Sequence, residues 1–166
     1  MPDKETIERA KKDKRQGKAP STQAGEFVRE EFEHIREGKH GARSTKQAIA
    51  IGLSKARRAG VELPPPKKGA VPEKTRRSAQ RASRAGHDGA HSPSPKRARA
   101  ATRALQREPD AAASHTALAK HARAAAARHT RSERSATARQ AARTKGPAAR
   151  SAAARKAAHT RAAHRT

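Results

Sequence analysis

The sequence predicts a mostly α-helical protein with extensive disorder, in which a small helical hairpin precedes a long basic tail. Three observations support this fold class. Local signals agree on one structure only within residues 38–60, and beyond residue 72 the large aliphatic residues are limited to Leu105 and Leu118. The formal net charge is +25, with 33% charged and 1% aromatic residues. Such chains bury too little apolar surface to offset the conformational entropy lost on folding.

The best-defined element is a helix expected at about residues 45–59. Ser44 occupies the N-cap position and Gln47 follows three residues later, which is the spacing of a capping box. Gly60 and the prolines at 64–66 end the helix. Small and apolar residues recur along one stripe at helical spacing: Ala48, Ile49, Gly52, Leu53, Ala56 and Ala59.

A second helix is expected at about residues 21–37, and the two helices form a hairpin over residues 20–63. The apolar face of the helix at 21–37 is predicted to pack against the helix at 45–59. The first helix contributes Phe27, Val28, Phe32 and Ile35, and the second contributes Ile49, Leu53 and Ala56. The acidic row is predicted to be a solvated face: Glu26, Glu30, Glu33 and Glu37. A hairpin this small rarely stands alone, so we expect a homodimer through residues 21–60 or folding on a partner.

The flanking segments carry weaker signals. Residues 1–19 are predicted as a basic N-terminal arm with a marginal helix at 3–15, because Ile7 is its only strongly apolar residue. Residues 64–72 form a Pro-rich linker. Residues 73–166 are predicted as a basic Ala/Arg-rich tail, helical at most in pieces, because like charges at i, i+4 spacing repel. The expected pieces lie at 73–85, 96–108, 111–145 and 148–164.

The distribution of charge points to a polyanionic partner. Residues 1–69 carry 17 Lys/Arg against 10 Asp/Glu, whereas residues 70–166 carry 23 against 5. Nucleic acid is the usual partner of so basic a segment. Membrane binding is not expected, because the tail lacks Trp, Phe and Tyr anchors. No apolar run has the length of a membrane span, which favours a cytoplasmic protein.

No enzyme activity, cofactor or metal site is expected. The chain has no cysteine, which excludes thiolate ligands and a cysteine nucleophile. Its nine histidines form no standard ligand motif. His87 and His91 bracket Asp88, but the neighbouring Gly and Pro residues predict a loop that would not hold them together.

The predicted nucleic-acid contacts fall into two groups. Gly38 to Arg43 precede a helix N-terminus, where a phosphate can dock; the alternative is that the two glycines only form a turn. The contacts in the hairpin are Lys39, His40, Arg43, Lys46, Lys55, Arg57 and Arg58. Those in the tail are Lys96, Arg97, Arg99, Arg103, Arg123, Arg128, Arg131, Arg139, Arg143, Lys145, Arg150, Arg155 and Lys156.

Two resemblances accompany these patterns. Residues 38–60, GKHGARSTKQAIAIGLSKARRAG, resemble a bacterial family of small basic proteins of unknown function. This resemblance implies a bacterial, intracellular origin and a hairpin that forms one unit. The tail resembles the Ala/Lys/Arg-rich tails of linker-histone-like DNA-binding proteins, and Ser94-Pro-Lys-Arg97 resembles their Ser-Pro-basic-basic motif. The tail differs from those of linker histones because it contains more Arg than Lys. Arg also binds phosphates well, so this difference does not argue against DNA binding.

The expected function is nonspecific DNA binding by a nucleoid-associated protein. In this interpretation the tail neutralises phosphates and compacts or bridges DNA, with an affinity that falls steeply with salt. Two alternatives remain open. One is an RNA- or ribosome-binding basic protein, because Arg-rich segments also bind RNA. The other is a protein-interaction module at residues 21–60 with a basic appendage.

Overall fold

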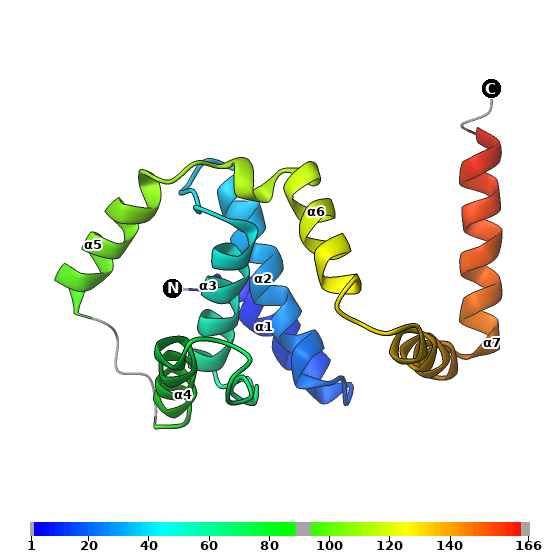
Figure 1. Ribbon diagram of the computed structural model, residues 1–166, viewed down its shortest axis with the longest axis horizontal. Helices are drawn as coiled ribbons and strands as arrows, with labels where there is room; N and C mark the ends of the chain where they lie inside the picture. Colours follow the sequence, from blue (N-terminus) through cyan, green and yellow to red (C-terminus); the bar gives the residue numbers. More distant parts are fainter. Residues whose placement is uncertain (1, 89–93, 164–166) are drawn as a thin grey trace. The chain divides into compact units, whose positions relative to one another are not determined.

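The computed structural model describes residues 2–88 and 94–163, which form seven α-helices and one short 3₁₀ helix (Figure 1). The chain divides into two compact units, residues 1–121 and 122–166. The prediction of extensive disorder with a tail that is helical only in pieces is therefore wrong. Ala and Arg are strong helix formers, and part of the expected tail packs into the first unit.

The hairpin consists of α2 (Pro20–Arg36) and α3 (Thr45–Arg58), each within about a residue of its expected bounds. The Ser44 hydroxyl accepts a hydrogen bond from the Gln47 backbone N–H at 3.2 Å. In return, the Gln47 side chain accepts one from the Arg43 N–H at 3.0 Å. These bonds satisfy two donors that the start of α3 would otherwise leave without partners.

The two hairpin helices approach each other most closely at Gly52. A Cβ placed on Gly52 would lie 2.7 Å from the Val28 Cα and 3.0 Å from the Phe27 carbonyl oxygen. Neither is the end of a flexible side chain, so the backbone itself would have to move. The absence of a side chain at this position therefore sets the distance between α2 and α3.

Two further helices cover the hairpin. Helix α1 (Lys4–Arg15) packs against α2, with Ala10 buried beside Phe27. Helix α4 (Glu73–His87) packs against α3, where Ala82 is buried and Gly86 lies against the Arg57 backbone. The helix therefore runs two residues past the expected end at residue 85, and Gly86 is a site of close helix contact.

The segment between α5 (Pro95–Gln106) and α6 (His115–Ala126) completes the core of the first unit. Backbone N–H groups of Gly41 and Ala42 donate to the carbonyls of Leu105 and Pro109, both at 2.9 Å. The 3₁₀ helix η1 (Ala111–Ala113) follows. One buried cluster joins the hairpin to this segment: Phe32, Ile35, Ala42, Ala48, Ala112 and Ala113, with Leu118 packed against it.

Residues of one chain therefore cover the apolar face of the hairpin. A second cluster lies toward the other end of α2 and contains Phe27, Ala24, Ala56, Val61 and Ala10. Since α1, α4 and the 105–118 segment supply this cover, the hairpin is part of a larger helical unit and does not stand alone.

The second unit is built differently. Its long helix α7 (Arg131–Ala163) contains no buried residue and is interrupted at Gly146, whose φ is +72°, just before Pro147. Figure 1 shows the two segments of α7 running in different directions. None of the described helices is long and apolar enough to cross a membrane.

Replacing Gly52 with alanine should destabilise the first unit by about 1–3 kcal/mol, because the new methyl group forces two packed helices apart. Gly25→Ala is the matched control. Gly25 also lies in a helix, but a Cβ added there would meet no atom within 4 Å, so alanine should stabilise by up to about 1 kcal/mol. Chemical denaturation of both variants measures the difference; equal effects would contradict the close-packing explanation.

Candidate functional site

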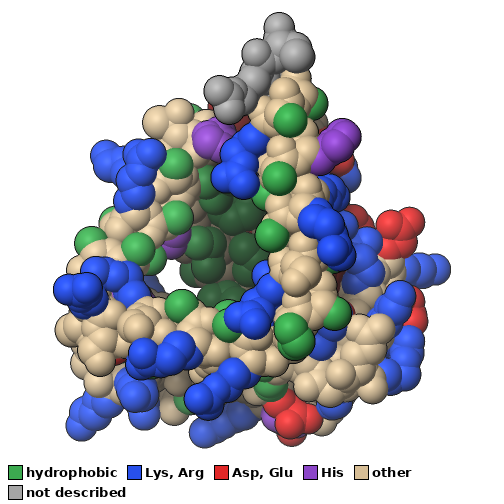
Figure 2. Space-filling model, turned by 90° about the vertical axis from the view of Figure 1, so that its right-hand side faces the viewer, with side chains coloured by type: hydrophobic (Ala, Val, Ile, Leu, Met, Phe, Trp, Pro, Cys, Tyr) green, Lys and Arg blue, Asp and Glu red, His purple; other side chains and the backbone are tan. Residues whose placement is uncertain are grey.

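The basic residues predicted in the tail lie at the surface. All thirteen side chains, from Lys96 in α5 to Lys156 in α7, are exposed. Figure 2 shows Lys and Arg spread over much of the displayed face, whereas Asp and Glu gather at a few places. Ser94 caps α5, since its hydroxyl accepts from the Arg97 N–H at 3.4 Å. The Ser-Pro-basic-basic motif therefore begins a helix.

Few acids accompany these basic residues. Residues 122–166 contain twelve Lys or Arg and a single acid, Glu133, for a net formal charge of +11. Within the described residues, no ion pair joins any of the thirteen to a carboxylate. Their hydrogen bonds are local, as from Arg99 to the Pro95 carbonyl at 3.3 Å and from Arg139 to the Ser135 hydroxyl at 3.1 Å. The positive charge of these helices is consequently left for a partner to neutralise.

The hairpin residues are more varied. Lys46 and Arg58 are exposed. Lys39 is exposed but lies 2.8 Å from a Glu37 carboxylate oxygen, and the hydrogen bond raises the pKa of Lys39. Arg43 lies 3.8 Å from Glu108. These four residues can reach a partner, though two of them have an acid nearby.

The loop before α3 does not present a free phosphate cradle. The N–H groups of Gly41 and Ala42 already donate to residues 105 and 109, and the His40 ring turns inward. Gly41 has no space for a Cβ because the backbone of Glu108 lies against it. Gly41 thus serves chain packing, whereas Gly38 turns the chain after α2 with a φ of +71°. We exclude His40 from the proposed nucleic-acid surface.

Two other predicted contacts are enclosed by the protein: Arg57 is buried, and the Lys55 side chain is only 20% exposed. Arg57 is 8% exposed and donates to the Pro64 carbonyl at 3.3 Å, and burial lowers its pKa. Lys55 reaches between two buried carboxylates, at 3.1 Å from Glu30 Oε1 and 2.7 Å from Glu31 Oε2. Neither cation is free to bind nucleic acid, because Lys55 is held by two carboxylates of α2 and Arg57 by carbonyls of α3 and of the segment that follows it.

The buried carboxylates correct the prediction of a solvated acidic row. Glu30 is 2% exposed and Glu31 is fully buried, whereas Glu33 and Glu37 remain at the surface. Sequence spacing contained a signal for Glu31, which lies four residues after Phe27 and four before Ile35 in the middle of the apolar stripe. His87 ends α4, whereas His91 lies outside the described residues.

Lys55 compensates the charge of both carboxylates. Burial by itself would lower the pKa of Lys55, but the hydrogen bonds and negative charges of Glu31 and Glu30 outweigh that effect and raise it above 10.5. The ammonium group therefore remains charged in the folded state.

Replacing Lys55 with methionine should destabilise the protein by about 3–5 kcal/mol, because two buried carboxylates lose their cation. Lys46→Met, at an exposed position of the same helix, should change stability by less than about 0.5 kcal/mol. Urea unfolding followed by circular dichroism measures both. A similar small loss in the two variants would show that the ion group contributes little.

The contribution of Lys55 should depend on pH in one direction. A cation with a raised pKa in the folded state adds stability below its unfolded pKa of about 10.5 and loses it as pH rises through the folded value. The stability difference between the native chain and Lys55→Met should therefore be constant from neutral pH to about 10 and shrink above 10.5. A difference that keeps growing above that pH would contradict this assignment.

Comparisons with known proteins bear on the first unit. No curated protein and no solved structure matches the chain. Residues 3–68 match the sequence model of a family of unknown function, DUF6496. The matched segment starts just before α1, covers α1, α2 and α3, and ends after the prolines that follow α3.

Proposed function

We propose that the protein binds DNA without sequence specificity, as a nucleoid-associated protein, through the exposed basic side chains of α5, α6, α7 and the turn between α6 and α7. The observation that supports this most directly is the set of thirteen exposed Lys and Arg side chains with no carboxylate paired to them in the described chain. Cations of this kind release condensed counterions from DNA when they neutralise phosphates.

The aromatic residues favour a duplex over a single strand. Proteins that bind single strands without sequence preference stack bases on exposed aromatic rings. This chain has two Phe, no Tyr and no Trp, and Phe27 and Phe32 are 1% and 8% exposed in the core. Contacts with the phosphate backbone of a duplex remain as the mode that these side chains support.

Both units carry excess positive charge, which supports the bridging part of the proposal. Residues 1–121 have a net formal charge of +14 and residues 122–166 one of +11. A chain with two basic units can bind two duplex segments, or two stretches of one duplex. Such binding neutralises DNA locally and draws its segments together.

The test is a salt series on the full chain with a random-sequence DNA duplex, followed by fluorescence anisotropy. The interface variant replaces five unpaired cations of α7 by glutamine: Arg139, Arg143, Arg150, Arg155 and Lys156. The control variant replaces five cations that each pair with an acid in the first unit: Lys11, Lys14, Lys18, Arg29 and Arg77. Both variants lose the same net charge of five.

The interface variant should lower the slope of log affinity against log salt by up to about 4–5, because each lost phosphate contact removes about 0.9. The control should lower it by less than about 1. Equal losses would mean that net charge and not this surface governs binding. Tighter binding to duplex RNA than to duplex DNA at matched salt would favour the RNA-binding alternative.

A further inference from the structure

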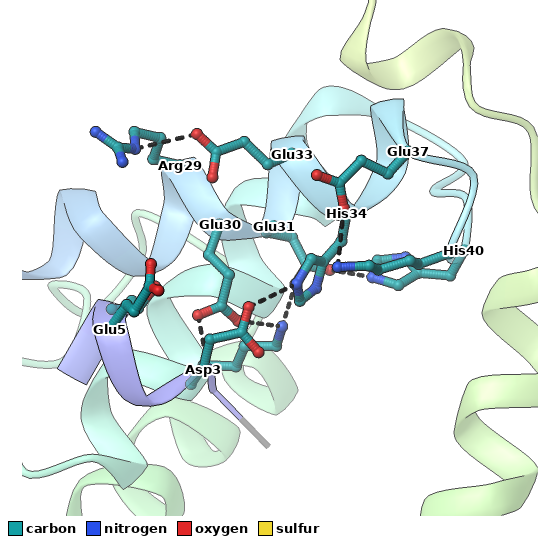
Figure 3. Close-up of polar contacts among 12 residues, drawn as sticks. Asp3, Glu5, Arg29, Glu30, Glu31, Glu33, His34, Glu37 and His40 are labelled. Atoms are coloured by element: carbon teal, nitrogen blue, oxygen red, sulfur yellow. Dashed lines mark hydrogen bonds and ion pairs between the residues drawn. The ribbon is translucent and has the colours of Figure 1, made fainter.

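Three side chains with metal-ligating atoms meet at the end of α2. Glu31 and His34 lie one helical turn apart on α2, and His40 comes from the following loop (Figure 3). One ligand atom from each lies within 4.8 Å of the others. Because residues at i and i+3 share one helix face, the Glu-x-x-His pair presents both groups toward the loop that carries His40.

One oxygen of the Glu31 carboxylate lacks the hydrogen bond that a fully buried carboxylate requires. Oε1 accepts no hydrogen bond, although the side chain is completely buried. The Oε2 atom lies 2.7 Å from the Lys55 ammonium. The other oxygen, Oε1, has no cation at comparable distance and lies 3.5 Å from His40 Nε2. A second positive charge near Oε1 would complete the site.

The His40 ring is oriented as a metal-bound histidine would be. Its Nδ1 atom lies 3.2 Å from the Gly41 carbonyl oxygen, which can only accept, so Nδ1 carries the proton. Nε2 then points a lone pair toward the Glu31 carboxylate unless a second proton or a cation lies between them. Two ligands about 2.0–2.2 Å from a tetrahedral zinc ion lie about 3.3–3.5 Å apart, and the observed separation is 3.5 Å.

His34 has the carboxylate support that is common for metal-binding histidines. Its Nε2 atom lies 3.2 Å from Asp3 Oδ2, and this hydrogen bond lowers the pKa of Asp3. The Asp3 backbone N–H donates in turn to Glu30 Oε2 at 3.0 Å. The rings of His34 and His40 meet edge to face, with centroids 6.0 Å apart.

The charges of the cluster leave a deficit that a divalent cation would fill. Asp3, Glu30 and Glu31 contribute three negative charges, and Lys55 supplies one positive charge at 2.7–3.1 Å from the two glutamates. The ammonium group of Lys39 lies near Asp3, but its charge is balanced by Glu37, whose carboxylate oxygen is 2.8 Å away. With neutral histidines, the cluster carries a net charge of −2.

We propose that Glu31, His34 and His40 bind a divalent transition-metal ion, with zinc as the expected species. Two imidazoles and one carboxylate suit zinc, whereas magnesium and calcium prefer oxygen ligands alone. The ion would link α2 to the loop whose Gly41 and Ala42 hold residues 105 and 109. Its role is therefore structural and independent of DNA binding.

The first test titrates Zn²⁺ into the full chain without an affinity tag, in competition with a chromophoric chelator. The site variant is His34→Gln with His40→Gln. The control is His115→Gln with His129→Gln, two exposed histidines outside the cluster. We expect one tight site in the native chain and the control, and an affinity at least about 100-fold weaker in the site variant. At 100-fold excess over Kd, Zn²⁺ should raise the melting temperature by about 5–10 °C.

A measurement on the native chain keeps the proposal testable even if the site variant fails to fold. Zinc should shift the ring ¹⁵N resonances of two histidines only, assigned to His34 and His40, at one equivalent. Three results would overturn the proposal. The site variant could still bind zinc tightly, the shifts could be confined to other histidines, or the native chain could bind zinc no more tightly than the site variant does. Two doubly protonated rings at neutral pH without zinc would show that protons fill the deficit instead.

Discussion

The structure depends on close contact between backbones, because the chain has few large apolar side chains to bury. Gly52 lets α3 approach α2, Gly86 lets α4 approach α3, and Gly41 receives the backbone that follows α5. Around these contacts the core contains more alanines than large residues. When side chains contribute little volume, helix axes must come together for dispersion and apolar burial to accumulate. The glycines set where that happens.

A second consequence of the small core is that charged groups share the interior. The two adjacent glutamates of α2 are buried against α3 and the start of the chain, with Lys55 between them. A buried ion group contributes little net stability but penalises any register that separates its members. Here it fixes how α3 lies on α2, and it orients the histidines that follow on α2 and in the loop.

The hairpin could be predicted from sequence because local signals determine it. The cap formed by Ser44 and Gln47 and the apolar stripes of the two helices depend on spacing within one segment, and spacing is visible in a sequence. The burial of Glu31 could also be predicted from the sequence, because Glu31 lies between Phe27 and Ile35 in the apolar stripe. The inward position of Lys55 and the burial of Arg57 could not be predicted, because the sequence does not show which way a long cationic side chain turns.

The contribution of residues 105–118 could not be predicted for a different reason. Ala112 and Ala113 are core residues, yet they stand in a region where alanine is the commonest neighbour, so composition does not distinguish them. Their role arises from pairing with the loop before α3 and the first residue of α3, some 70 residues earlier, through bonds such as that from the Thr45 hydroxyl to the Ala112 carbonyl at 2.8 Å. Hydrogen bonds across such a distance leave no periodic pattern in the sequence.

This late contribution affects how the protein is made. Residues 105–118 leave the ribosome about 40 to 50 residues after the hairpin and its following prolines, which at about 5–20 residues per second takes about 2–10 s. During that interval Phe32 and Ile35 lack the alanines and Leu118 that later cover them. The newly made chain therefore exposes an incomplete core while basic sequence is still being added. The timing of synthesis, and a chaperone that shields this face for a few seconds, would influence how much of the protein reaches its native state.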